Sequence, residues 1–285
     1  MKSFHKAAIV GTGLIGGSIA MAIKKQGLAD KVVGVSRHQE SLRIARQKGA
    51  IDQGAQGISI VKGADLLILA LPVGLIIKLA PRLAKLVAPG CVVTDVGSTK
   101  AEITAALSKI FPFYVGSHPL AGSEKRGIAY ADAKIFKNSL CILTPTINTR
   151  SEVTRRVSAL WKKFGARITL LSPVTHDKIL SFTSHLPHAV AFSLIGAVPP
   201  EHLKFASSGL KDTTRLAASE SGLWVDIFLS NRKDILKAIG AFERNLHGLK
   251  TAINKKDRKW LARFLDNAKE KRGRLSVYAE GDTFL

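Results

Sequence analysis

The sequence predicts an α/β fold in which a doubly wound parallel sheet is followed by a second, all-α domain. Three observations support this prediction. A glycine turn near the N-terminus joins an apolar strand to a helical pattern, strands then alternate with helices as far as residue 171, and helical patterns follow from residue 173. We therefore place the domain boundary near Ser172, which gives domains of residues 1–172 and 173–285.

The glycine turn reads Gly-Thr-Gly-Leu-Ile-Gly over residues 11–16 and follows the apolar run 7–10. Gly11 allows a tight turn, Gly13 lets a pyrophosphate approach the backbone, and Gly16 lets the helix pack close to its strand. Free N–H groups at the start of a helix can then bind phosphates. Because the turn follows a strand and opens a helix, we interpret it as a dinucleotide-binding (Rossmann) motif and not as an ordinary structural turn.

The second predicted strand, residues 31–35, ends where the adenosine ribose of a dinucleotide would lie. An acidic residue there binds the ribose 2′-hydroxyl, but this chain has Ser36 and Arg37. A guanidinium can hold a 2′-phosphate, so we favour NADP over NAD as the cofactor. Alternatively, Arg37 stacks on the adenine or points to solvent. The residues assigned to the cofactor are Gly11, Gly13, Leu14, Ile15, Gly16, Ser36, Arg37 and Thr99.

Further strands and helices continue the alternation in order. A helix is expected over residues 39–48, and the continuous apolar run 65–71 reads as a strand buried on both faces. A helix to about residue 87 leads to another buried strand, residues 91–95. Ligands of such sheets lie at the carboxyl ends of the strands, which is where Ser98 falls. Ser98 either caps the next helix or contacts a substrate.

His118 lies between a strand and a loop rich in glycine and proline, which is not an ordinary position for a core histidine. Such a loop can hold an imidazole over the nicotinamide. The near-neutral pKa of an imidazole suits proton abstraction from an alcohol. The sequence therefore predicts that His118 is a general base.

Five motifs together resemble those of a known enzyme family. Residues 116–124 read Gly-Ser-His-Pro-Leu-Ala-Gly-Ser-Glu, and they follow the glycine turn and an Asp-Val-Gly-Ser-Thr-Lys segment at 95–100. Later come Ser-His-Leu-Pro-His at 184–188 and Lys-Asp-Thr-Thr-Arg at 211–215. In type and order these motifs resemble the prephenate/arogenate dehydrogenase family of tyrosine biosynthesis, over nearly the whole chain.

The resemblance implies an NAD(P)-dependent oxidoreductase. Its reaction would be the oxidative decarboxylation of prephenate or arogenate, giving 4-hydroxyphenylpyruvate or tyrosine, and no residue decides between the two substrates. His118 would take the proton of the substrate hydroxyl, and Ser98 would orient that hydroxyl or the nicotinamide. Arg215 would bind a substrate carboxylate, although a surface or capping arginine is the alternative. Asp212 would position the segment that carries Arg215. The other substrate-binding candidates are His188, His185, Ser123 and Glu124.

A helix is expected over residues 175–198, and Pro187 within it predicts a kink and a freed carbonyl group. His185 and His188 are three residues apart and share a helix face, but no third ligand has the right spacing, so we expect no metal. Either histidine can instead be buried and bonded to the freed carbonyl, and for His185 this alternative is equal to substrate binding. His-Asp at 176–177 reads as a helix-start pair, to which we assign no catalysis.

Apolar residues recur every three or four positions from Trp224 to Ile253. This pattern predicts a single helix of about eight turns. Such a stripe packs within the second domain or pairs with a second copy, and the resemblance favours a homodimer. A final helix over 257–272 and a short tail from Ser276 complete the prediction.

Composition narrows the classes of protein. A chain of 285 residues with 46% hydrophobic content can bury a sizeable core. The net charge of +22 suits an anionic partner, but it is spread along the chain without a nucleic-acid motif. We therefore attribute the charge to the attraction of small anionic molecules, or simply to a basic proteome, and do not expect a nucleic-acid partner. Cys91 and Cys141 lie in apolar runs, as reduced core cysteines do. The apolar run 66–77 is too short to span a bilayer, so a cytoplasmic protein without a membrane partner is expected.

Two other functions fit part of the pattern. A β-hydroxyacid dehydrogenase also joins a nucleotide-binding domain to helices, but we do not find the Gly-x-x-x-Asn-x-x-Lys setting of its lysine. A non-catalytic, NADP-binding regulator would attach to nucleic acid through its charge. Salt-dependent binding to duplex DNA would support that second alternative.

Overall fold

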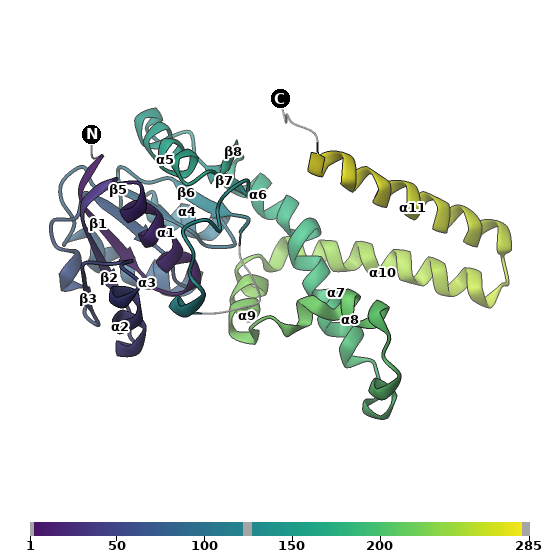
Figure 1. Cartoon of the computed structure of the whole chain (residues 1–285). Coiled ribbons are helices and arrows are strands. Elements are labelled where there is room, and N and C mark those ends of the chain that lie inside the picture. Colours follow the sequence, from purple (N-terminus) through teal and green to yellow (C-terminus); the bar gives the residue numbers. More distant parts are fainter. Residues whose placement is uncertain (1–2, 122–126, 281–285) are drawn as a thin grey trace. The chain divides into compact units, whose positions relative to one another are not determined.

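The computed structural model describes residues 3–121 and 127–280. Its N-terminal part is built on a five-stranded parallel sheet with the strand order β3-β2-β1-β4-β5 (Figure 1). This sheet confirms the predicted fold class, with small shifts at the strand ends. The strands are β1 (Phe4–Val10), β2 (Ala29–Val35), β3 (Gln53–Ala55), β4 (Leu66–Leu69) and β5 (Val92–Asp95).

Two hydrophobic clusters, one on each face of the sheet, form the core. Strand β4 contributes side chains to both clusters: Leu66 and Ile68 belong to one, and Leu67 and Leu69 to the other. Alternating side chains of a strand point to opposite faces, so a continuous apolar run indicates a strand covered on both sides. The helices of this part are α1 (Leu14–Lys25), α2 (Gln39–Gln47), α3 (Val73–Ala84), α4 (Ala101–Leu107) and α5 (Ser151–Lys163).

A second, three-stranded sheet carries the predicted base. Its strands are β6 (Gly116–Pro119), β7 (Leu140–Thr144) and β8 (Arg167–Leu170), in that order. Strand β6 runs antiparallel to β7, so the chain is not parallel throughout. A parallel pair needs a crossover, usually an α-helix, whereas the described residues between β6 and β7 contain only a 3-10 turn, Ile128–Tyr130.

Helix α6 (Pro173–Leu180) opens the helical part of the chain. The Oγ atom of Ser172 accepts a hydrogen bond from the backbone N–H of Thr175 at 3.1 Å, and Pro173 occupies the first turn. A π-helical turn, Ser181–His185, separates α6 from α7 (Leu186–Gly196). The predicted kink is therefore a π turn placed just before Pro187, where the missing N–H of proline interrupts the regular pattern.

The stretch Pro173–Gly196 is the one helix among the described residues that is long and apolar enough, by length and composition, to cross a membrane. The apolar run 66–77, which the sequence analysis considered, is not such a helix. Core helices of globular proteins pass the same test. His176 and Asp177, which lie in this helix, are buried in polar contacts with the N-terminal part of the chain.

The remaining helices are α8 (Ser208–Thr214), α9 (Ser221–Ser230), α10 (Arg232–Asn254) and α11 (Arg258–Glu280). The predicted single helix from Trp224 to Ile253 is wrong, because Asn231 leaves the helical conformation, with φ −116° and ψ 30°. The predicted tail is also wrong as far as Glu280, since α11 extends to that residue. By its contacts the chain divides into two compact units, Met1–Arg232 and Lys233–Leu285.

Within the first unit, two carboxylates of the helical part bind the starts of helices that follow the sheet. Asp226 on α9 accepts a hydrogen bond from the backbone N–H of Val73 at 2.7 Å, at the start of α3. Asp177 on α6 accepts bonds from the backbone N–H groups of Lys100 and Ala101 at 2.7 and 2.8 Å, at the start of α4. The first N–H groups of a helix have no partner within it and carry partial positive charge. These carboxylates therefore fasten α9 and α6 to the carboxyl edge of the sheet.

Candidate active site

The glycine turn has the geometry that a dinucleotide needs. Gly11 has a φ of +102°, and a Cβ on it would lie 2.1 Å from the carbonyl oxygen of Ala70. A Cβ on Gly16 would lie 1.9 Å from the carbonyl oxygen of Gly11, whereas one on Gly13 would meet nothing within 4 Å. Helix α1, which starts with Leu14 and Ile15, has no side-chain cap and no acidic residue in its first turn. Open space over uncapped N–H groups fits a pyrophosphate.

The end of β2 carries the groups predicted to contact the ribose. Ser36 Oγ accepts a hydrogen bond from the backbone N–H of His38 at 3.2 Å. Arg37 is exposed, and its Nε donates to the imidazole of His38 at 3.0 Å. Gln56 holds the backbone by donating to the carbonyl of Arg37 at 2.8 Å. The guanidinium therefore lies at a fixed turn, where it can meet an anion.

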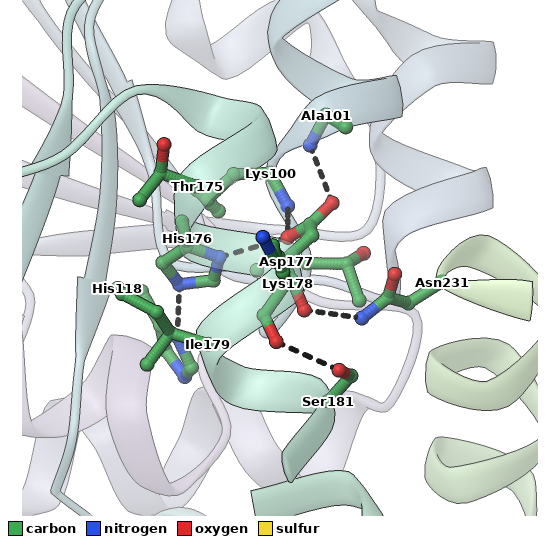
Figure 2. A network of polar contacts seen from close by, with 12 residues as sticks. Lys100, Ala101, His118, Thr175, His176, Asp177, Lys178, Ile179, Ser181 and Asn231 are labelled. Atoms are coloured by element: carbon green, nitrogen blue, oxygen red, sulfur yellow. Dashed lines mark hydrogen bonds and ion pairs between the residues drawn. The ribbon is translucent and has the colours of Figure 1, made fainter. Parts of the chain in front are cut away.

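His118 lies on β6 and is joined to two residues of α6. Its Nδ1 atom is 2.8 Å from Nε2 of His176, and Nδ1 of His176 is 2.8 Å from Oδ1 of Asp177 (Figure 2). His176 is fully buried and Asp177 is 2% exposed. The three side chains form a continuous line of hydrogen bonds.

The acceptor at the end of this line fixes the position of every proton in it. A carboxylate only accepts, so Nδ1 of His176 carries a proton and donates it to Asp177. In a neutral imidazole the other nitrogen then accepts, so Nδ1 of His118 donates to Nε2 of His176. The remaining nitrogen of His118, Nε2, is left with a free lone pair. A lone pair on Nε2 is what a general base requires.

The surroundings keep these imidazoles neutral. Burial holds the pKa of His118 well below its usual value of 6.5, and the nearby charges of His176, Lys100 and His185 act in the same direction. Burial also lowers the pKa of His176, although the hydrogen bond to Asp177 opposes that change. At neutral pH His118 is therefore unprotonated and available to accept a proton.

A buried ion pair lies behind the base. Nζ of Lys100 contacts a carboxylate oxygen of Asp95 and donates to the carbonyl of Ser117 at 2.8 Å, and both charged side chains are fully buried. Asp95 also accepts from the hydroxyl of Tyr114 at 2.7 Å. Ser117 Oγ accepts from the indole N–H of Trp161 at 3.0 Å. These contacts fix the backbone of β6 next to His118.

Ser98 and Thr99 lie between β5 and α4. The N-cap residue of α4 is Lys100, so the capping alternative for Ser98 is wrong. Ser98 is half-buried, and the described residues offer its hydroxyl no hydrogen-bond partner. The hydroxyl of Thr99 is 2.9 Å from that of Ser230 on α9. This contact uses one of the hydrogen-bonding positions of the Thr99 hydroxyl, so its side chain and its backbone both stay candidates for binding the cofactor.

The helical part contributes two more histidines around Trp224. His188 stacks on the indole with ring centroids 3.5 Å apart, and its Nδ1 donates to the carbonyl of Ser184 at 3.0 Å. His185 is 1% exposed, and its Nδ1 lies 3.1 Å from Nδ2 of Asn231. The alternative in which His185 bonds the carbonyl freed by Pro187 is therefore wrong.

Arg215 begins a 3-10 turn that follows α8 and is exposed. It lies close enough to His188 for its charge to lower the pKa of that imidazole, after the larger effect of burial. Asp212, which was predicted to position this segment, is exposed. The hydroxyl groups of Thr213 and Thr214 donate hydrogen bonds to backbone carbonyls of α8. The candidates Ser123 and Glu124 lie outside the described residues.

Sequence reasoning missed four residues that support His118. His176 and Asp177 looked like a helix start, and Lys100 and Asp95 were read as parts of a motif. One signal was available for the last two: a lysine five residues after an aspartate that ends an apolar strand is unusual in a core unless the two are paired. The partnership of His118 with His176 spans 58 residues and has no local signal.

Comparison with known proteins identifies the family of the chain. Residues 19–170 match the family model described as "Prephenate dehydrogenase, nucleotide-binding domain", and residues 172–267 match "Prephenate dehydrogenase, dimerization domain". The chain belongs to the prephenate dehydrogenase family. The resemblance inferred from the motifs is thereby confirmed.

Curated relatives of this prephenate dehydrogenase family member cover most of its length. It is 35% identical to the prephenate dehydrogenase of Bacillus subtilis (strain 168), over 96% of this chain and 76% of the relative. It is 34% identical to the cyclohexadienyl dehydrogenase of Zymomonas mobilis, over 99% of both chains.

Solved structures give the same result. The prephenate dehydrogenase from A. aeolicus in complex with hydroxyphenyl propionate and NAD+ has a TM-score of 0.90 at 35% identity, with 95% of this chain and 98% of that chain covered. The Synechocystis arogenate dehydrogenase has a TM-score of 0.81 at 29% identity, covering 95% and 99%. As a prephenate dehydrogenase family member the chain is an oxidoreductase with a nicotinamide dinucleotide cofactor.

Proposed function

We propose that the protein catalyses the oxidative decarboxylation of prephenate or arogenate in tyrosine biosynthesis. One observation carries the proposal beyond family membership: Asp177 and His176 orient His118 so that its Nε2 lone pair is free. The substrate of such a reaction is a cyclohexadienol, and its hydroxyl must lose a proton while hydride leaves the same carbon. A neutral, oriented imidazole supplies the base for that step.

Each residue of the candidate site has its own role in this reaction. The proton of the substrate hydroxyl moves to Nε2 of His118, and the positive charge that develops is stabilised through His176 by the carboxylate of Asp177. The bound nicotinamide dinucleotide supplies the hydride acceptor. Ser98, whose hydroxyl is uncommitted among the described residues, orients the substrate hydroxyl or the nicotinamide. Loss of carbon dioxide from the ring then gives the aromatic product.

Substrate binding requires cations, because both substrates carry two carboxylates. We assign one carboxylate to Arg215, whose guanidinium has no ion-pair partner among the described residues. His188, stacked on Trp224, would meet the side-chain end of the substrate. The roles predicted for His185, Asp212, Ser123 and Glu124 also belong to this proposal.

For the cofactor we propose that Arg37 favours NADP by binding its 2′-phosphate. The exposed guanidinium at the end of β2 supports this preference. The relative from A. aeolicus was solved with NAD+, so NAD is the competing cofactor. A direct comparison of affinities for the two cofactors decides between them.

We further propose a cytoplasmic homodimer with domains 1–172 and 173–285. The matched dimerization domain supports a dimer. So do exposed apolar side chains on α10, which are 53% exposed at Leu246 and 57% at Ile253. Sedimentation of the purified protein at micromolar concentration tests the dimer.

The decisive experiment for the function is an assay of prephenate and arogenate, each with NAD+ and with NADP+, following reduced nicotinamide. One preferred combination fixes substrate and cofactor together. No turnover in any combination, with the fold intact and the cofactor bound, would overturn the proposal.

A further inference from the structure

Asn231 occupies the break between α9 and α10 and is 4% exposed. Its Nδ2 atom donates to the backbone carbonyl of Asp177 at 2.9 Å and lies 3.1 Å from Nδ1 of His185 (Figure 2 shows the first contact). One side-chain amide therefore joins the residue that ends the His118 line to a second buried histidine.

The carbonyl of Asp177 fixes which way the amide points. A carbonyl oxygen only accepts, so the NH2 group of Asn231, and not its oxygen, must face Asp177. The second hydrogen of the same NH2 group is then the one directed at His185. Nδ1 of His185 must accept it, and a neutral imidazole that accepts at Nδ1 carries its proton on Nε2.

Among residues 3–121 and 127–280, this Nε2–H group has no hydrogen-bond acceptor. His185 is 1% exposed, and Nε2 is buried without a hydrogen-bond partner among the described residues. A buried polar group left unpaired loses its hydrogen bonds to water and gains none in their place, which destabilises the folded protein. Such groups in native structures call for an explanation, and a bound ligand is one.

The surroundings of His185 indicate which ligand. Its ring lies nearly perpendicular to the indole of Trp224, on which His188 stacks, and the centroids of the His185 and Trp224 rings are 6.1 Å apart. His185 also lies close enough to His118 for a charge on it to lower the pKa of the base. Burial is the main cause that lowers the pKa of His185 itself; the charge of Asp177 raises this pKa, and His176 and His188 lower it. The unpaired donor therefore lies among the residues of the candidate site.

We infer that Asn231 is a positioning residue that holds His185 in its Nε2–H form, so that this group donates to a carboxylate or hydroxyl oxygen of the bound substrate. The inference rests on the proposed function for the identity of the ligand. Asp177 then organises two opposite imidazoles: its carboxylate leaves His118 with an accepting nitrogen, and its carbonyl, through Asn231, gives His185 a donating one.

The tautomer of His185 is measured directly, without activity. We would record two-bond 1H–15N spectra of protein labelled with [15N]histidine and assign His185 by the signals lost in His185→Gln. The expected result is a proton on Nε2 in the wild type. A proton on Nδ1 in the wild type would overturn the inference, and this first test needs no variant at Asn231.

Asn231→Asp tests the cause. A carboxylate cannot donate to Nδ1, so we expect the proton of His185 to move from Nε2 to Nδ1. Asn254→Asp makes the same change on an exposed residue and should leave His185 as in the wild type. An unchanged tautomer in Asn231→Asp would show that Asn231 does not set it. If that variant does not fold, Asn231→Ser, with a single donor hydrogen, takes its place in the comparison.

Prephenate without cofactor serves as the ligand probe, because it cannot turn over. In the wild type the Nε2–H signal of His185 should shift when prephenate is added. In a separate assay with cofactor, the KM of Asn231→Asp for prephenate should be roughly 10- to 100-fold higher than that of the wild type, while the affinity for the cofactor stays the same. An unmoved signal with prephenate bound would remove the substrate contact. Failure of the proposed function differs from this outcome, since prephenate would then not bind at all.

Discussion

Nδ1 of His118 and Nε2 of His176 are 2.8 Å apart, although the two residues are separated by 58 positions in the sequence. The first lies on β6 and the second on α6, so the direction of the base depends on how the helical part meets the sheet. His176 in turn is held by Asp177, which also binds the start of α4. A change at His176 should therefore affect the reaction more than the binding of either ligand.

His176→Leu should lower kcat roughly 10²- to 10⁴-fold, the usual range for losing an effective general base. The apolar side chain removes the acceptor for Nδ1 of His118, so that ring loses its fixed tautomer. His176→Gln restores an acceptor oxygen near the position of Nε2 and should recover part of the loss. Steady-state kinetics with thermal unfolding as a control measure this, and a wild-type kcat in His176→Leu would contradict the assignment.

The pH profile of kcat/KM should retain activity well below pH 6.5. The base must be neutral to accept a proton, and burial together with the nearby charges holds the pKa of His118 well below its usual value of 6.5. Activity is therefore lost only as the pH falls through that lowered pKa. An acid limb at or above 6.5 would count against His118. His118→Asn should abolish turnover while cofactor binding persists.

Arg215→Ala should have two linked effects. The charge of Arg215 lowers the pKa of His188, so its removal should raise that pKa in an NMR titration. The KM for the substrate should also rise roughly 10- to 100-fold, because a hydrogen-bonded ion pair to a carboxylate is lost. Lys211→Ala, an exposed cation of the same segment, is the matched control. An unchanged KM in Arg215→Ala would remove this residue from the site.

The stability of the protein should fall as the pH drops from about 6.5 to 4. Burial lowers the pKa of His185 to about 4, so the unfolded chain takes up a proton in this interval that the folded protein does not. His185→Gln should reduce the change in urea midpoint between pH 7 and pH 5. His247→Gln, at an exposed position, should leave that change as it is. An equal pH dependence in the wild type and in His185→Gln would refute the link.

Arg37→Ala should weaken NADP binding while NAD binding stays the same, because only NADP carries the 2′-phosphate. The neighbouring exposed Arg46 on α2 gives a control substitution with the same charge change. Titration of each variant with both cofactors measures the effect. Retained NADP affinity in Arg37→Ala would refute the phosphate contact.

The sequence predicted the sheet because its signals are local. The glycine turn and the apolar run of β4 each lie within a few residues, and β4 is buried on both faces as expected. The break at Asn231 was missed because the apolar spacing continues on both sides of it. What ends the helix there is a tertiary preference, since the amide binds Asp177 and His185.

Predictions for the site followed the same rule. His118 was proposed as the base because a histidine just before a loop rich in glycine and proline is visible in the sequence, although the structure places it on β6 and not in the loop. The partners that give it a direction were not, because contacts between α6 and β6 form only when distant segments pack. Burial of the Lys100 and Asp95 pair likewise depends on the completed fold.

The π turn at Ser181–His185 has a consequence for how this site can change. A π turn is equivalent to one residue inserted into an α-helix, and one residue corresponds to about 100° of rotation. Deleting a residue there would restore a regular helix and swing His176 and Asp177 about a quarter-turn or more away from the face of His185 and His188. The single inserted residue therefore sets the rotation of one half of the helix relative to the other. Its loss would move the residues that orient His118, the proton acceptor, away from His185, the proposed hydrogen-bond donor.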